Sequence, residues 1–179
     1  VGETLVPGAR PHRQPDRVST QPPASATALA LSRKIATLRG ASLVHLASSE
    51  RRAEEIGRAL AGLCPDLDIL VLPPWDCLPY DRASPSRDVM GRRMRVLKQL
   101  SQTRSPRIVI TSPEALIQKL PPPAALDGAF LELKPGQPLD RDAFAAFAAR
   151  TGHVADDRID EPGEIAFQGE VIDVFPADA

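Results

Sequence analysis

The segment from Leu72 to Arg87 constrains the fold of this chain more than any other part of its sequence. It reads Leu-Pro-Pro-Trp-Asp-Cys-Leu-Pro-Tyr-Asp-Arg-Ala-Ser-Pro-Ser-Arg and holds the only tryptophan and the only tyrosine of the chain. Its four prolines lack a backbone N–H donor, so neither a helix nor a central strand runs through it. An apolar stretch precedes it and an arginine-rich amphipathic stretch follows. We therefore predict a rigid loop at the end of a parallel strand, where α/β proteins commonly place functional groups.

The residues around this loop alternate between strand-like and helix-like patterns, which predicts an α/β fold. Helices of ordinary crossover length separate short apolar stretches, so the strands are expected to be parallel and covered on both faces, in three layers. Strands are predicted at Leu43–Leu46, Ile69–Leu72 and Arg107–Ile110, and helices at Ala28–Leu38, after a Ser49 cap, at Arg87–Leu100 and after Ser112-Pro113.

Composition divides the chain into three parts. Residues 1–23 are rich in proline, arginine and glutamine without an apolar period, so we predict a disordered arm. Residues 24–127 form the predicted α/β domain, and residues 128–179 begin a smaller α+β domain that we expect to be incomplete. In that last part we predict a strand at Ala129–Leu133, a turn at Pro135-Gly136, a helix from an Asp140 cap to Arg150 that stops at Gly152, and antiparallel strands at 164–167 and 170–175.

The place where a helicase-type α/β domain binds phosphate has no phosphate loop here. Such a loop is rich in glycine and ends in Gly-Lys-Ser/Thr, so that backbone N–H groups and the lysine hold the phosphates. The segment Thr20–Leu29 has neither glycine nor lysine, and it contains two prolines. The α/β domain therefore resembles a degenerate P-loop domain, and we expect it to bind no nucleotide.

No other catalytic or metal-binding arrangement is visible in the sequence. His12, His45 and His153 are scattered, and Cys64 and Cys77 match no metal-ligand spacing. We expect no metal, no cofactor and no enzymatic activity for this chain. No apolar run approaches the roughly 18 residues that a membrane-spanning helix needs, so we expect a cytoplasmic protein.

The basic stretch after the proline-rich loop has two interpretations. Its cations could contact DNA phosphates, or they could form the solvated outer face of a crossover helix, which we favour. Trp75 and Tyr80 likewise could stack on bases or pack against the sheet, and packing is favoured because prolines fix the loop. The candidate DNA contacts are Arg87, Arg92, Arg93, Arg95 and Lys98.

Several motifs together resemble the N-terminal region of the bacterial transcription-repair coupling factor. The two most specific are Trp-Asp-x-Leu-Pro-Tyr-Asp and a closing Gly-x-x-x-Asp-x-Phe-Pro string. The resemblance covers roughly residues 28–177, with every motif in the expected order. The matching segments are 72–81, 84–85, 92–97, 110–116, 161–164 and 169–176.

The resemblance implies an adaptor. The family's N-terminal module is similar to the excinuclease B subunit, but it lacks the working phosphate loop and the tyrosine-rich hairpin. Its smaller domain docks the excinuclease A subunit in nucleotide excision repair. Elsewhere in the parent protein, an ATP-dependent DNA translocase displaces stalled RNA polymerase. The partner-binding residues implied for this chain are Glu164, Gln168, Gly169 and Phe175.

This chain departs from the family pattern at positions that matter for docking. The family usually has arginine where this chain has Gln168, and a tyrosine with a nearby arginine where it has His153, Val154 and Ala155. Losing a charged partner at an interface commonly costs about 2 kcal/mol or more. Two other hypotheses stay open: a helicase-type ATPase fragment that contacts DNA through the helix at 87–98, and a structural domain that restrains a motor elsewhere in a longer chain.

Overall fold

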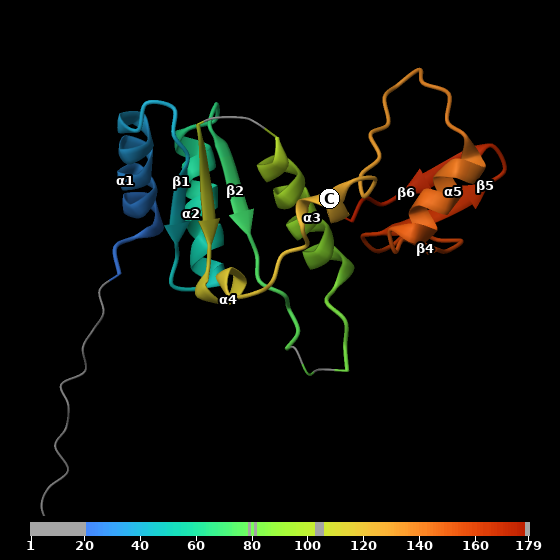
Figure 1. The fold of residues 1–179 in the computed structure, drawn as a ribbon, viewed down its shortest axis with the longest axis horizontal. Coiled ribbons are helices and arrows are strands. Elements are labelled where there is room, and N and C mark those ends of the chain that lie inside the picture. Colours follow the sequence, from blue (N-terminus) through green and yellow to red (C-terminus); the bar gives the residue numbers. More distant parts are fainter. Residues whose placement is uncertain (1–20, 79, 81, 103–105, 178–179) are drawn as a thin grey trace, which may run out of the picture.

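Two small sheets organise the protein. The computed structural model describes residues 21–78, 80, 82–102 and 106–177, and within them the chain forms two three-stranded sheets (Figure 1). We call residues 21–116 the α/β unit and residues 123–177 the small lobe. Of the disordered arm predicted for residues 1–23, residues 1–20 lie outside the described part of the chain. Residues 21–23 already contact the α/β unit, because the Arg52 side chain donates a hydrogen bond to the carbonyl of Pro22.

The sheet of the α/β unit is fully parallel. Its strands are β1 (Leu43–Leu46), β2 (Asp68–Leu72) and β3 (Arg107–Thr111), in the spatial order β1-β3-β2. Ile108 of the central strand lies in register with Leu43 on one side and with Ile69 on the other. The sequence predicted all three strands, and the structure extends two of them by one residue.

Helices cover both faces of this sheet. On one face, α1 (Ala24–Thr37) and α2 (Glu50–Leu63) enclose a core with Ile108 and Ile110, both completely buried. On the other face, α3 (Arg87–Ser101) packs Val96 against β2. These three layers match the predicted mixture of helix and parallel sheet. In Figure 1, α3 also lies between the sheet and the small lobe, so it borders both halves of the molecule.

Side-chain caps fix where three helices of the α/β unit begin. The Ser49 hydroxyl accepts a hydrogen bond from the backbone N–H of Arg52, as predicted for the start of α2. Ser86 caps α3 in the same way, and Ser112 caps the short helix α4 (Pro113–Leu116). Each hydroxyl satisfies a donor that would otherwise have no partner inside the helix.

The small lobe packs one helix on the second sheet. After the 3₁₀ helix η1 (Pro123–Leu126) and a long connection, α5 (Arg141–Arg150) begins at Asp140, whose carboxylate accepts from two backbone N–H groups at 3.0 Å. The sheet consists of β4 (Val154–Ala155), β5 (Glu164–Gln168) and β6 (Val171–Val174), with β5 in the centre, parallel to β4 and antiparallel to β6. The predicted cap, helix and hairpin are confirmed.

The prediction of a strand at Ala129–Leu133 is wrong. Both edges of β5 are already paired, with β4 and with β6, so the central strand offers these residues no free edge. They form an irregular segment beside α3 instead, where the Lys98 amine lies 5.1 Å from the centroid of the Phe130 ring. The turn predicted at Pro135-Gly136 is present.

Two glycines of α2 provide a test of the packing between this helix and the sheet. A Cβ at Gly57 would lie 2.5 Å from Cγ2 of Val71, a stiff side chain, whereas a Cβ at Gly62 would meet nothing within 4 Å. We expect Gly57→Ala to lower the free energy of unfolding by roughly 1–3 kcal/mol through overpacking. Gly62→Ala should raise it by about 0.5–1 kcal/mol, because alanine is the better helix former. Urea unfolding measures both; equal midpoints for the two variants would contradict this packing.

Candidate protein-interaction site

The proline-rich loop is tied down at its beginning by Arg93 of α3. The Arg93 side chain is buried, and its Nη1 donates to the carbonyl of Pro73 and, at 3.2 Å, to Oε1 of Gln118. Its guanidinium carbon lies 4.2 Å from the centroid of the Trp75 ring, within the range of a cation–π interaction. The backbone N–H of Trp75 donates to the same Gln118 oxygen at 2.9 Å. Helix α3, the loop and the segment after α4 therefore meet at one guanidinium.

Arg93 is buried within the fold. It is 1% exposed, and its Nη2 has no hydrogen-bond partner among the described residues. Burial lowers the pKa of its guanidinium. For this residue, burial argues against the predicted DNA contact. The amphipathic pattern did not show that the loop folds back over it. For Trp75 the packing partner that the structure shows is Arg93 of α3, whereas the prediction named the sheet. For Tyr80, which is 96% exposed, the packing prediction is wrong.

The far end of the loop is closed by Asp76. Its carboxylate accepts hydrogen bonds from the backbone N–H of Ser86, at 3.1 and 3.3 Å to its two oxygens. Hydrogen bonds from the side chain and the backbone of Ser86 lower the pKa of the Asp76 carboxyl. Because Ser86 also caps α3, the loop returns directly into the start of that helix.

Most of the remaining cations of α3 are engaged within the chain. Arg87 Nη2 lies 2.8 Å from a carboxylate oxygen of Glu161 and 3.4 Å from one of Glu164, and both carboxylates belong to the small lobe. Arg92 pairs with Glu54 at 2.7 Å and with Asp88 at 3.8 Å. Among the five candidate DNA contacts, Arg95 is the residue classed as exposed. For Arg95 and Lys98 the DNA contact stays a prediction.

The residues predicted to bind a protein partner lie at two ends of the β5–β6 hairpin. Gln168 and Gly169 are exposed at its turn, whereas Glu164 and Phe175 adjoin each other at its base, where the N–H of Phe175 donates to the carbonyl of Glu164 at 2.9 Å. Consecutive strand residues rise about 3.3 Å, so the two pairs are more than 10 Å apart along β5. The structure does not bring the four residues into one cluster.

Glu164 anchors the fold of the small lobe. Its side chain is 11% exposed, and its Oε2 accepts from the backbone N–H groups of Asp160 and Glu161, both at 2.8 Å. Its other oxygen faces Arg87. These bonds argue against the predicted partner contact of Glu164, because both carboxylate oxygens already have partners inside the chain.

The turn of the hairpin is supported by a residue that sequence reasoning missed. Arg141 of α5 donates a hydrogen bond to the carbonyl of Gly169, and its guanidinium lies 5.1 Å from the centroid of the Phe167 ring. Phe167 in turn packs edge-to-face on Phe144 at 6.3 Å between centroids. Arginine at the first position of a helix opposes the helix dipole, and that local mismatch was the available signal. We call Arg141, Gln168, Gly169 and the half-exposed Val171 the hairpin-tip surface.

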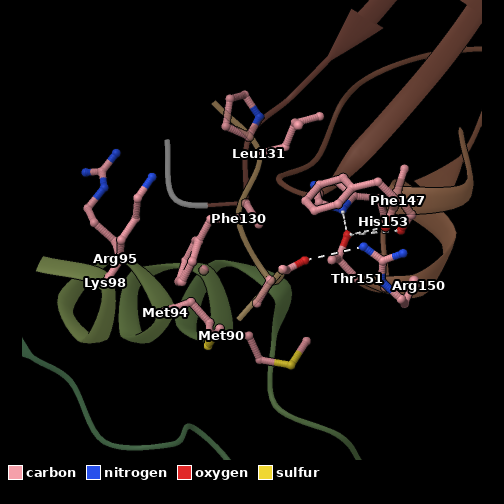
Figure 2. A pocket seen from close by; sticks show the side chains of 18 of the residues that line it. Met90, Met94, Arg95, Lys98, Phe130, Leu131, Phe147, Arg150, Thr151 and His153 are labelled. Atoms are coloured by element: carbon pink, nitrogen blue, oxygen red, sulfur yellow. Dashed lines mark hydrogen bonds between the residues drawn. The ribbon is translucent and has the colours of Figure 1, made fainter. Parts of the chain in front are cut away.

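A groove of about 970 Å³ runs between α3 and the small lobe (Figure 2). Figure 2 shows Met90 and Met94 on α3, Phe130 and Leu131 on the irregular segment, and Phe147 on α5 around it. Beyond them His153 places its Nδ1 3.0 Å from the Thr151 hydroxyl oxygen, and burial lowers the pKa of this histidine. Sequence reasoning missed the groove, because it exists only through the relative placement of the two halves.

The described residues contain neither a candidate metal site nor a membrane-spanning helix. No group of three or more histidine, cysteine, aspartate or glutamate residues in this part of the chain is placed to hold a metal ion. No helix among residues 21–78, 80, 82–102 and 106–177 is long and apolar enough to cross a bilayer.

Comparison with known proteins confirms the resemblance that the motifs predicted. No family model matches the chain. The transcription-repair-coupling factor of Escherichia coli is 35% identical over 111 residues, which is 62% of this chain and 10% of that protein. The protein of the same name from Haemophilus influenzae is 31% identical over 126 residues, 70% of this chain and 11% of its own, and that from Mycobacterium bovis is 28% identical over 168 residues, 90% and 13%. The chain thus spans about a tenth of the length of these relatives.

The Arg93 contacts lead to a prediction that the single tryptophan can report. We expect Arg93→Ala to lower the free energy of unfolding by on the order of 3 kcal/mol. The carbonyl of Pro73 loses its hydrogen-bond donor, and the missing buried side chain leaves a cavity. The emission of Trp75 should also change, since its ring loses the guanidinium above it. The matched control is Arg58→Ala, at an exposed position of α2. Similar stability and emission for the two variants would show that Arg93 does not hold the loop.

Proposed function

We propose that this chain is a non-catalytic interaction module of a transcription-repair coupling factor-like protein, which docks the excinuclease A subunit in transcription-coupled nucleotide excision repair. The observation that carries the proposal is the hairpin-tip surface. The position where the family usually has a docking arginine is Gln168, which stands exposed beside Gly169 on a turn supported by Arg141. A turn presented on a packed sheet and helix suits the recognition of a protein surface, because little is left to order on binding.

The start of α1 supports a non-catalytic role. In a nucleotide-binding domain of this type, the loop before the first helix presents backbone N–H groups to phosphate. Here Pro22 and Pro23 occupy that place, and α1 begins without a side-chain cap. Proline has no N–H to offer, so we propose a degenerate P-loop domain and assign the ATP-dependent translocase, together with contacts to RNA polymerase, to other parts of a longer parent protein.

The engagement of α3 argues against DNA as the main partner. Each neutralised phosphate steepens the salt dependence of binding, and a helix with five free cations would have a slope of about −4 to −5 on logarithmic axes. Arg93 is buried, and Arg87 and Arg92 are paired with carboxylates. A helicase fragment that binds DNA through this helix would have to do so without these three cations.

The test is a calorimetric titration of the chain with purified excinuclease A subunit, using a variant that restores the family residue. We expect Gln168→Arg to tighten binding by about tenfold, or roughly 1.4 kcal/mol, because an arginine at the tip adds a charged hydrogen-bond donor. Ala61→Arg, exposed on α2 of the α/β unit, adds the same charge away from the hairpin and should leave the affinity unchanged.

Two outcomes would overturn the proposal. If neither the chain nor Gln168→Arg binds while circular dichroism shows both folded, the chain does not dock this subunit, and a role in restraining a motor gains support. If Ala61→Arg tightens binding as much as Gln168→Arg, the interaction is a general charge effect and the hairpin tip is not its site.

A further inference from the structure

The groove between α3 and the small lobe has apolar walls that nothing in the described chain fills. Met90 is 37% exposed on one wall, and Leu131 and Leu133 are 45% and 53% exposed on the irregular segment. Phe130 and Phe147 complete the lining. Methionine side chains adapt their shape to a partner, and grooves with such walls commonly receive the apolar face of a helix.

Cations flank this apolar surface from both halves of the molecule. On the α3 side, the Lys98 amine lies 5.1 Å from the centroid of the Phe130 ring. On the α5 side, the guanidinium of Arg150 lies 5.6 Å from the centroid of the Phe147 ring. Arg95 adds a third positive charge beside Lys98 (Figure 2). Among the lining residues that the structure describes, Asp127 is the one carboxylate, so the rim is strongly positive.

The apolar groove and its positive rim together indicate which kind of partner can bind. Nucleic acid would meet the cations, and its bases could stack on the phenylalanines, but it has no aliphatic side chains to place between the methionines and leucines. A flat membrane surface cannot enter between two facing walls. An amphipathic peptide with an apolar stripe and acidic flanks satisfies both features, because its stripe fills the groove while its carboxylates face Lys98 and Arg150.

We propose that the groove between α3 and the small lobe docks an acidic amphipathic segment of a partner protein. This surface is distinct from the hairpin-tip surface: it lies at the base of the β5–β6 hairpin, where Gly163 and Val174 line it, whereas Gln168 lies at the turn. The inference goes beyond docking of the excinuclease A subunit and does not depend on it.

The two methionines of the chain make a direct assay possible. Met90 and Met94 are its only methionines, and both line the groove. The probe is a synthetic peptide of about 15 residues with leucines at helical i, i+3, i+4 and i+7 spacing and glutamates elsewhere. A second peptide carries lysine in place of every glutamate. Methyl-carbon NMR of the chain labelled at methionine reports binding, and fluorescence polarisation gives the affinity.

We expect the acidic peptide to shift both methionine signals and the lysine peptide to shift neither. The double variant Lys98→Glu/Arg150→Glu should weaken binding of the acidic peptide at least about tenfold. The matched control Lys34→Glu/Arg58→Glu places the same charge change on exposed positions of α1 and α2 and should bind as the original chain does. Unshifted methionine signals of the free variants would show that the groove itself is intact.

Several results would overturn the proposal. Equal binding of the two peptides would show an apolar surface without charge selection. Equal loss in the two double variants would show a nonspecific charge effect. Methionine signals that change with the concentration of the chain alone would identify a second copy as the occupant. Gln168→Arg leaves the groove residues unchanged, so its effect on binding of the excinuclease A subunit is measured separately. One proposal can therefore fail without the other.

Discussion

The interaction between Arg87 and Glu164 holds the two halves of this protein together. Arg87 is the first residue of α3, and its Nη2 reaches the carboxylates of Glu161 and Glu164 at the base of the small lobe. Glu164 is itself fixed by two backbone N–H groups. Gly163 lets the chain pass close to this arginine, since a Cβ there would lie 3.0 Å from Cδ of Arg87. The backbone of Gly163 has φ +81°, a conformation that glycine adopts without strain.

This ion pair determines what α3 presents to solvent. Because the helix packs on the sheet through Val96 and binds the small lobe through Arg87, two of its sides are occupied. Arg93 extends the buried side to the proline-rich loop, where it fixes Trp75. A helix that reads as a basic surface in the sequence is thus largely structural. Its remaining side forms one wall of the groove, with Arg95 and Lys98 among the residues that line it.

The sequence predicts local structure well here, because local chemistry decides it. Ser49 and Asp140 bind the first N–H groups of their helices, and Gly152 ends α5 with a positive φ, all readable from residue type and spacing. The failures concern residues whose surroundings come from distant parts of the chain. Burial of Arg93 depends on Gln118 and on the folded loop. Both edges of the central strand β5 are already paired, so the segment Ala129–Leu133 cannot add to it. The two-residue strand β4 is too short to leave a pattern.

The candidate site was predicted only in part, because some of its residues are positioned by distant parts of the chain. The strand pattern placed Gln168 and Gly169 at a turn that is indeed exposed. The motif resemblance also marked Glu164, whose oxygens are used inside the lobe. Arg141, which supports that turn, lies 28 residues away from Gly169 in the sequence. No spacing rule links two such positions. The turn of an exposed hairpin can therefore be located from sequence, whereas the side chains that hold it in place require the fold.

Hydrogen exchange of the chain in the presence and absence of the excinuclease A subunit tests the central claim most directly. If the small lobe docks this subunit through the hairpin-tip surface, the amides around Gln168, Gly169 and Val171 should exchange more slowly in the complex, while those of β1 and α1 stay unchanged. Protection confined to α3 or to the α/β unit, with the hairpin turn exchanging as in the free chain, would contradict the account.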